Sequence, residues 1–600
     1  PLAAILGHLR AARRAVAELP EAGGDAAAGE GARRAAVLAL LEEKIAVAQT
    51  ALAAAAGVAV DAWTEAETAT PGSALRVEAR LWHGRPAAAA AGGAPGEADS
   101  EADSEADSEP DPEAPTIEPV GVLVTGAVPW DAEPARGDEG EVVAPGSGAL
   151  APGELAAWAF HAMPAGAAPP TVPYFLERPL EGALYDWSGV PPEVRGEPFG
   201  PPLLVVRFLL RIGAAEVALE REVVQRVSDQ AMGEVRRPLR LVPRVEVAVE
   251  PELVVWSTAE PGSAGAAAGD RPPREVRVSL RSNALYPLAG RLRLEVPEGW
   301  PAAEPVAFEI LEPGGETALR LPLALPPDLA RGHYRVEAVA ELGAGLTHRE
   351  SYPRVDYPHV RPTPYPKPAT VRVAAAEIRL PELDAVGFVA GASDRLPQAL
   401  AAIGVPVEPL TGRELAERDL SRFDAIVVGS RAYETDPGLA RANARLLDYA
   451  RAGGLVVVLY QQYGFFEGGF APYPLELARP HDRVTDEAAP VALLAPDHPA
   501  LAVPNRIGPE DWQGWVQERG LYFARTWDEA YAPLLELPGE EGALRGGLLV
   551  APVGDGTWVY TGLAFFRQLP AGVTGAYRLL ANLLALETGA APAGPGGGRP

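Results

Sequence analysis

The sequence contains no cysteine. That absence excludes disulfide bonds, thiolate zinc sites and a cysteine nucleophile. It does not fix the compartment, because secreted proteins can also lack cysteine, and an extracytoplasmic location is only slightly favoured. Lysine is nearly absent as well: only Lys44 and Lys367 occur, and arginine takes its place.

Long apolar runs are also missing. No stretch of about 18 or more apolar residues occurs, so we predict no membrane span. No signal peptide is visible at the start of the chain. Because the chain begins Pro1-Leu2-Ala3 without methionine, we expect that it is either a processed protein or a fragment.

The net charge is −29 over 600 residues, which argues against nucleic acids and anionic membrane surfaces as partners. The length predicts about three or four domains. We predict a multidomain α+β protein with a helical hairpin, two β-sandwich-like modules and a C-terminal α/β domain with a parallel sheet.

The first half of the chain changes from helical to strand periodicity. Residues 1–56 read as a helical connector of two helices, separated by glycines 23, 24, 29 and 31. Residues 57–244 alternate with period two and predict a β-rich domain. Within it, residues 87–115 hold three EADS repeats and predict a disordered acidic insertion rather than a calcium loop, because they lack the ligand spacing of an EF-hand.

The second half contains two further domains. Residues 245–351 hold short alternating segments and predict an immunoglobulin-like sandwich. Residues 352–370 are rich in proline and predict a semi-rigid linker. Residues 371–587 alternate apolar strands with helices, which predicts a parallel sheet covered on both faces; residues 588–600 predict a disordered tail.

Local signals within residues 371–587 predict individual elements. The apolar run Ala425–Val428 predicts a buried strand. Thr411 and Glu414 have the spacing of a capping box, and Asp436 precedes Pro437 as an N-cap precedes the first residue of a helix, so each predicts a helix start.

Polar and aromatic residues follow the predicted strands of the α/β domain. Ligands of open α/β sheets bind beyond the carboxyl ends of the strands, so we predict a sugar- or peptide-binding rim there. A contact surface between domains is the alternative. The candidate residues are Ser393, Asp394, Arg395, Arg431, Tyr433, Glu434, Gln461, Gln462, Tyr463, Arg479, His481, Asp482, Trp512, Trp515, Glu518 and Arg519.

Two catalytic alternatives depend on the same region. Ser430 follows a predicted strand, where a nucleophile elbow lies, but its surroundings lack the second glycine of G-x-S-x-G. His481, Asp482 and Asp486 have ligand chemistry suitable for a metal but no recognised spacing. No dinucleotide fingerprint and no P-loop occurs. We therefore predict no catalytic residue and no cofactor or metal site in this chain.

Several stretches resemble the non-catalytic C-terminal region of large bacterial PIG-L (LmbE-like) deacetylases. The resemblance is to whole stretches across most of the chain. The stretches are LEEKIAV (41–47), PYFLE (173–177), LYDW (184–187), GEVRRP (233–238), GASDR (391–395), DAIVVGSRAYE (424–434), YQQY (460–463), GFAPYP (469–474), ARPHDRVTDE (478–487), NRIGP (505–509), DWQGWVQERGLY (511–522) and YTGLAFFRQLP (560–570).

The resemblance implies an accessory region for substrate binding or positioning. In that family a separate N-terminal domain holds zinc on an H-P-D-D-E motif and removes an acetyl group from an amino sugar. No such motif occurs here, so none of those catalytic residues carries over. The implied partners are an amino-sugar or glycan ligand and the protein's own missing N-terminal domain, with no nucleic acid.

The resemblance also bears on individual domains. It implies that residues 371–587 are similar to class I glutamine amidotransferases, without their cysteine, and that residues 245–351 resemble modules attached to glycosidases. Two alternatives stay open. One is a stand-alone carbohydrate- or protein-binding protein, and the other is a hydrolase acting from the α/β domain.

Overall fold

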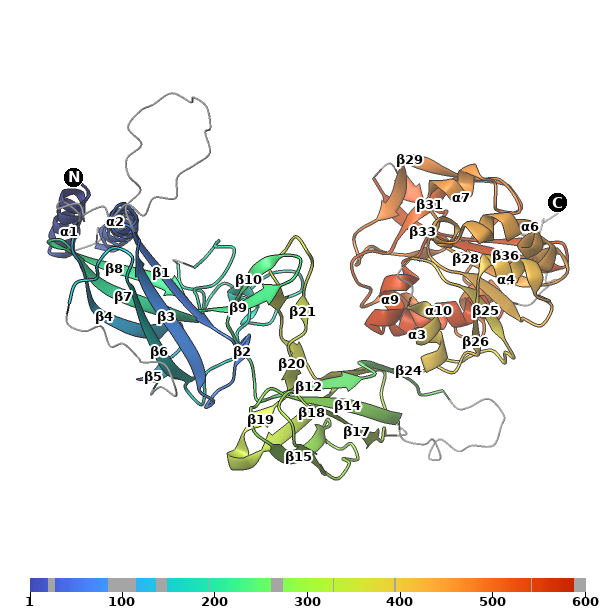
Figure 1. The fold of residues 1–600 in the computed structure, drawn as a ribbon. Helices are drawn as coiled ribbons and strands as arrows, with labels where there is room; N and C mark the ends of the chain where they lie inside the picture. Colours follow the sequence, from blue (N-terminus) through green and yellow to red (C-terminus); the bar gives the residue numbers. More distant parts are fainter. Residues whose placement is uncertain are drawn as a thin grey trace, which may run out of the picture.

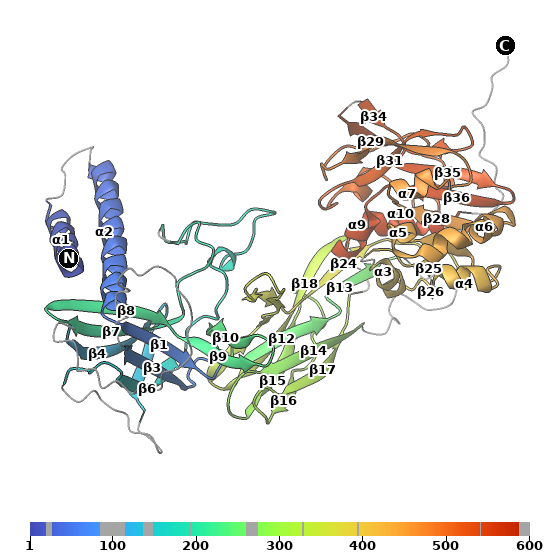
Figure 2. The same cartoon turned by 45° about the horizontal axis from the view of Figure 1, so that its top comes forward.

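The computed structural model describes residues 1–19, 27–84, 115–135, 148–192, 194–259, 274–326, 329–392, 395–540 and 542–586. The chain forms a multidomain α+β protein in which a central sandwich contacts a β-rich part on one side and an α/β domain on the other (Figures 1 and 2). The predicted acidic insertion, apart from Pro115, and the predicted tail lie outside the described residues. No helix in the described ranges is both long and apolar enough to cross a membrane.

The two predicted N-terminal helices are present as α1 (Leu2–Ala17) and α2 (Ala27–Ala55). They run antiparallel and are joined by an Arg13–Glu42 ion pair. Gln49 of α2 accepts a hydrogen bond from the backbone of Ala218 and so attaches the pair to the β-rich domain. The prediction that all four glycines interrupt the helices is wrong for Gly29 and Gly31, which lie inside α2 because neighbouring alanines offset their low helix propensity.

The β-rich domain has two main sheets packed around one core. The larger has the order β10-β9-β1-β3-β6-β5 and the smaller β4-β7-β8. Alternate residues of β3 and β7, such as Val77 and Phe208, are fully buried between them. The strands are β1 (Val58–Thr64), β2 (Thr68–Ala69), β3 (Leu75–His83), β4 (Ile117–Gly126), β5 (Trp130–Pro134), β6 (Leu155–Pro164), β7 (Leu204–Ile212), β8 (Ala215–Glu222), β9 (Val224–Asp229), β10 (Gly233–Pro238) and β11 (Arg240–Leu241), with the short 3-10 helix η1 (Tyr174–Leu176) between β6 and β7.

The central sandwich packs the sheet β12-β14-β17 against the sheet β13-β24-β18-β15-β16. Its strands are β12 (Val245–Glu250), β13 (Leu253–Ser257), β14 (Arg274–Ser282), β15 (Leu288–Glu295), β16 (Val306–Ile310), β17 (Glu316–Leu323), β18 (Gly332–Leu342), β19 (Thr347–His348) and β24 (Thr370–Ala376), with η2 (Gly343–Gly345) after β18. Strand β24 follows the proline-rich segment, where we expected the α/β domain to begin at residue 371. It instead pairs with β13 and β18 inside the sandwich.

The proline-rich segment differs from the predicted linker. It leaves and re-enters the sandwich at adjacent points, because β20 (Glu350–Ser351) pairs with β23 (Lys367–Pro368) and β21 (Arg354–Val355) pairs with β22 (Thr363–Pro364). We call this hairpin, residues 350–368, the arm. It extends to the β-rich domain (Figure 1), where Arg354 pairs with Glu67 and Arg361 lies over the ring of Phe199. The arm therefore ties two domains together instead of separating them.

The α/β domain has a seven-stranded sheet of order β26-β25-β27-β28-β36-β35-β32. Strands β26, β25, β27, β28 and β36 are parallel to one another, whereas β35 pairs antiparallel with both β36 and β32, so the parallel sheet that we predicted is a mixed one. The strands of the sheet are β25 (Val386–Val389), β26 (Val407–Leu410), β27 (Ala425–Val428), β28 (Leu455–Leu459), β32 (Ala532–Pro533), β35 (Leu548–Val553) and β36 (Gly556–Thr561).

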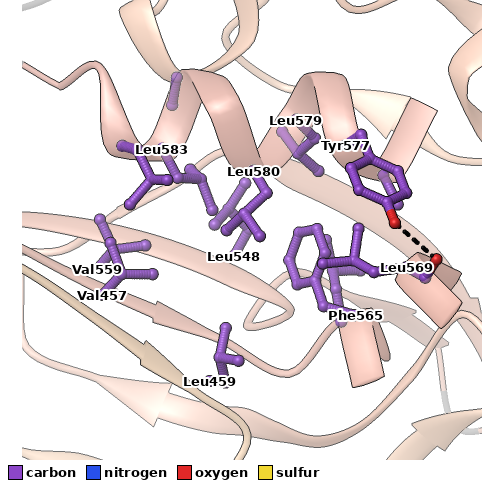
Figure 3. Close-up of a cluster of buried hydrophobic side chains, with 14 of the residues drawn as sticks. Val457, Leu459, Leu548, Val559, Phe565, Leu569, Tyr577, Leu579, Leu580 and Leu583 are labelled. Atoms are coloured by element: carbon purple, nitrogen blue, oxygen red, sulfur yellow. Dashed lines mark hydrogen bonds between the residues drawn. The ribbon is translucent and has the colours of Figure 1, made fainter. Parts of the chain in front are cut away.

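Helices cover both faces of this sheet (Figure 2). They are α3 (Leu396–Ala402), α4 (Gly412–Glu417), α5 (Ala432–Thr435), α6 (Pro437–Arg451), α7 (Tyr463–Glu467), α8 (Pro499–Ala502), α9 (Phe565–Ala571) and α10 (Thr574–Leu584), with η3 (Pro509–Trp512). The predicted capping box of Thr411 and Glu414 is confirmed at α4, as is the predicted Asp436 cap of α6. Figure 3 shows one face, where Leu580 and Phe565 pack against the sheet and the Tyr577 hydroxyl donates to the Leu569 carbonyl.

An excursion between β28 and β35 adds a small layer at one edge of the sheet. Its main element is the antiparallel pair β29 (Leu475–Val484) and β31 (Gly520–Trp527), which lies beside α7. Strands β30 (Ala492–Leu493), β33 (Leu535–Gly539) and β34 (Gly542–Leu544) complete it. The excursion therefore brings residues far along the chain towards the carboxyl ends of the central strands.

Candidate functional site

The carboxyl ends of β27 and β28 are held together by backbone contacts. At the neighbouring β25–β27 junction, a Cβ added at Gly391 would lie 1.9 Å from the Ser430 carbonyl oxygen, so no larger residue fits. The Ala392 amide donates to that same oxygen at 2.9 Å, and the Arg431 amide donates to the Tyr460 carbonyl at 3.0 Å. The β25–β27 junction is the switch point of a doubly wound sheet, where ligands commonly bind, and Arg431 follows β27 at this point.

Arg431 is the centre of a polar network at this edge. Its guanidinium donates to Glu434 at 2.9 and 2.7 Å. With its amide turned to suit both neighbours, Gln462 donates to Glu434 at 2.9 Å and accepts from Arg431 at 3.2 Å. The hydrogen bond to Glu434 raises the pKa of Arg431. The predicted rim residues Arg431, Glu434 and Gln462 are thus brought together.

Aromatic rings lie beside this network. His481 stacks face to face on Tyr522, with ring centres 3.8 Å apart, and Tyr463 meets both rings edge-on. Tyr460 stacks on Tyr522 at 5.9 Å. Burial raises the pKa of both Tyr460 and Tyr522, and burial followed by the charge of Arg483 lowers the pKa of His481. The lowered pKa favours the neutral form of this histidine.

Glu518 adds a buried carboxylate. Its side chain is only 2% exposed and accepts hydrogen bonds from Arg483 at 3.0 Å and from Arg567 at 2.7 Å. Both arginines are partly exposed. After burial, the negative charge of Glu518 also contributes to the raised pKa of Tyr460. We use the name edge cluster for Arg431, Glu434, Tyr460, Gln462, Tyr463, His481, Glu518 and Tyr522.

The backbone of this region is unusual. Among the described residues, three that are not glycine have a positive φ: Arg431 at 62°, Gln517 at 67° and Tyr522 at 54°. Two of them belong to the edge cluster, and Gln517 precedes Glu518. A left-handed conformation costs roughly 1–2 kcal/mol for such residues. Strained residues gather at functional sites when their surroundings fix them, so this grouping singles out the edge cluster as the candidate site.

Several predicted rim residues have other roles. The prediction is wrong for Trp512, Trp515 and Arg519, which are buried: the tryptophans pack in the core, and Arg519 donates to backbone carbonyls. Tyr433 and Gln461 are also buried, where they hold α5 and the preceding turn in place through hydrogen bonds. A tryptophan in a loop sequence gives no local sign of whether it faces a ligand or a core.

The other predicted residues lie at the margin. Arg395 is exposed at the start of α3, and Ser393 and Asp394 lie outside the described residues. Arg479 covers the ring of Tyr463, with its guanidinium carbon 4.2 Å from the ring centre, and pairs with Glu467. Asp482 is held by Arg525.

The metal alternative receives no geometric support in the part of the chain that is described, where no group of three histidine, aspartate or glutamate side chains could hold an ion. Asp482 is engaged by Arg525, and Asp486 accepts a hydrogen bond from the Ala488 amide.

The elbow alternative meets a different obstacle. Ser430 is 2% exposed, and the left-handed position that a nucleophile elbow requires is occupied by Arg431. A guanidinium is not a nucleophile, since it stays protonated at physiological pH. The residue presented at the elbow thus suits binding rather than covalent chemistry.

The predicted rim does not include Tyr460, Tyr522, Arg483 or Arg567. Tyr460 directly follows the buried strand β28, and Tyr522 lies inside β31; neither position carried a signal of its own. Arg483 and Arg567 come from β29 and α9. Only the folding of the excursion onto the sheet brings them to Glu518.

Two cavities lie elsewhere in the described structure. One of about 670 Å³ is lined by residues that precede β27 and β28, such as Asp424 and Gly454, and so lies at the opposite, amino edge of the sheet. The other, of about 320 Å³, lies between the β-rich domain and the sandwich. Neither of these two cavities is lined by a residue of the edge cluster.

No protein-family model matches this sequence, and no curated protein matches it either. Among solved structures, the chain is similar to a β-galactosidase from Rahnella sp. R3 with 16% identity and a TM-score of 0.21, covering 33% of this chain and 31% of the enzyme. The exo-β-1,4-mannosidase Op5Man5 from Opitutaceae bacterium strain TAV5 gives 13% identity, a TM-score of 0.21 and coverage of 34% and 36%. The chain thus spans about a third of these enzymes. The Escherichia coli adhesin FdeC gives 8% identity, a TM-score of 0.14 and coverage of 52% and 64%.

Proposed function

We propose that this chain is the accessory region of a PIG-L-type, zinc-dependent N-acetyl sugar deacetylase and that its edge cluster binds part of the glycan substrate. The observation that carries the binding role is the edge cluster itself: stacked rings beside arginine–carboxylate pairs and an amide, fixed by left-handed residues. The deacetylase context comes from the sequence resemblance. The zinc and its ligands belong to a catalytic domain that is not part of this chain.

The chemistry of the edge cluster favours a saccharide. Sugar rings present apolar C–H faces, which pack on aromatic rings, and hydroxyl groups, which need both donors and acceptors. The cluster offers rings in Tyr463 and His481, donors in Arg431 and acceptors in Glu434. The ion pairs neutralise much of the local charge, so the surface does not require a charged ligand.

The folds of two domains fit this proposal. We infer that the central sandwich is immunoglobulin-like and that the α/β domain is related to class I glutamine amidotransferases. Its parallel strands follow the order of doubly wound sheets, with the second strand at the edge. The absence of cysteine and the presence of Arg431 at the elbow separate this domain from an amidotransferase that cleaves glutamine.

The test is a calorimetric titration of the whole chain with the β-1,4-linked tetramer of N-acetylglucosamine. We expect binding in the wild type and at least tenfold weaker binding in Tyr463→Ala, a loss of about 1.4 kcal/mol or more. Arg506→Ala is the matched control, because its exposed guanidinium pairs with Asp497 and belongs to no part of the edge cluster. Wild-type affinity in Tyr463→Ala, or no binding by the wild type, would overturn the proposal.

A further inference from the structure

A groove at the junction of the β-rich domain and the sandwich has the features of a second binding site. It has a volume of about 320 Å³, at the lower end of the range for small-molecule sites. The β-rich domain contributes residues of β1–β3 and the intervening turns, including Trp63, Thr68 and Glu78. The sandwich contributes Asn283 and Leu285 from the loop after β14.

The walls of this groove are fixed before any ligand binds. The Arg244 guanidinium donates to the Pro71 carbonyl at 3.0 Å, and a Cβ at Gly72 would come within 2.9 Å of that guanidinium. The Asn283 side chain donates to the Pro243 carbonyl and to Glu246, both at 3.0 Å. These bonds fasten the turn of the β-rich domain and the loop of the sandwich to the same connecting segment, residues 243–246, so the groove is formed in advance of binding.

The lining combines polar and apolar side chains, and its charged residues, Glu65, Glu78 and Arg76, leave a small excess of negative charge. Arg76 and Arg80 both pair with Glu78, at 3.7 and 3.4 Å. Glu65 is exposed, and within the described residues its carboxylate has no hydrogen-bond or ion-pair partner. Thr68 adds a half-buried hydroxyl, which can donate and accept. A ligand that matches this lining carries hydroxyl groups and one positive charge.

A buried tryptophan forms the apolar part of the wall. Trp63 is 7% exposed, and Arg80 and Arg226 lie over its ring at 4.6 and 4.1 Å. These two guanidinium groups hold the indole in one orientation. Leu285, which is 67% exposed, stands at the mouth of the groove. The groove thus combines a rigid ring, hydroxyl partners and the exposed carboxylate of Glu65.

We propose that this groove binds a single amino-sugar unit with a free ammonium group, held by Glu65 and the hydroxyl partners of the lining. This inference rests on the proposed function only for the source of the ligand, since an amino sugar with a free amine is the product of sugar deacetylation. The groove and the edge cluster share no residue and lie in different domains. Their occupancy can therefore be tested separately.

The experiment titrates the whole chain with the monosaccharides glucosamine, N-acetylglucosamine and glucose. Saturation-transfer NMR and calorimetry measure the binding of each sugar. We expect glucosamine to bind at least threefold more tightly than glucose in the wild type. Glu65→Gln removes that preference, and Ala74→Trp fills the groove from an exposed lining position and abolishes binding. Ala165→Trp places the same bulk on an exposed turn outside the groove and leaves binding unchanged.

Each outcome decides the matter. Equal affinity for glucosamine and glucose, or a preference that survives in Glu65→Gln, overturns the role of the carboxylate. Wild-type binding in Ala74→Trp overturns the groove as the site. Loss of monosaccharide binding in Tyr463→Ala, with normal binding in Ala74→Trp, assigns the sugar to the edge cluster, and so supports the proposed function while refuting this inference. No binding of any monosaccharide, with normal binding of the tetramer, refutes the groove alone.

Discussion

Replacing Glu518 by glutamine tests whether the buried carboxylate organises the edge of the α/β domain. Glu518 is 2% exposed and accepts hydrogen bonds from Arg483 and Arg567. Hydrogen bonds to charged groups contribute about 1.5–3 kcal/mol each. The side chains of Arg483 and Arg567 are 49% and 34% exposed, so hydrogen bonds from water offset part of the free energy lost with these contacts. We therefore expect Glu518→Gln to destabilise this region by about 2–4 kcal/mol.

The measurement is native-state hydrogen exchange of the peptides that contain β31 and α9, because a chain of several domains has no single free energy of unfolding. A loss of 2–4 kcal/mol accelerates exchange by about 30- to 700-fold. The matched control is Glu536→Gln, whose partly exposed pair with Arg545 is worth less than about 1 kcal/mol. If both variants change exchange in these peptides by the same factor, the reasoning from burial is refuted.

Two further predictions concern stability. Asn582 is fully buried; its side chain donates to the Asn505 and Ala500 carbonyls and accepts from the Asn505 amide, so Asn582→Leu leaves three backbone groups unsatisfied. We expect a loss of about 3–5 kcal/mol, measured by urea denaturation of the α/β transition, and a loss below about 1 kcal/mol would contradict the assignment. Burial, and then the charge of Arg244, lowers the pKa of His348 from 6.5 to about 4. Between these values His348 binds a proton in the unfolded chain but not in the folded one. The free energy of unfolding of the sandwich, which contains His348, should therefore fall as the pH drops from 6.5 towards 4. In His348→Gln the urea midpoint of the sandwich transition should fall less over this pH range than in the wild type. An identical pH dependence in the variant and the wild type would contradict the prediction.

Local patterns in the sequence determined many elements of the α/β domain. The apolar run Ala425–Val428 is a strand with those limits, since four consecutive buried positions need no partner to be recognised. The box of Thr411 with Glu414 and the Asp436 cap start helices where predicted, because each hydrogen bond spans three residues or fewer. Arg431 and Glu434 could be predicted as neighbours in the site for the same reason, because they lie three residues apart at the short helix α5.

The tertiary structure alone decided how distant segments combine. Strand β24 belongs to the sandwich because it pairs with β13, more than 100 residues earlier in the chain, and such pairing leaves no local pattern. The proline-rich arm looked like a linker because composition reports stiffness but not where the two ends meet. Tyr522 joins the edge cluster, while Trp512 enters the core, because the excursion folds over the sheet in one particular way. Burial is a property of the packed chain, so residue type predicted the chemistry of the site, whereas packing decided which residues form it.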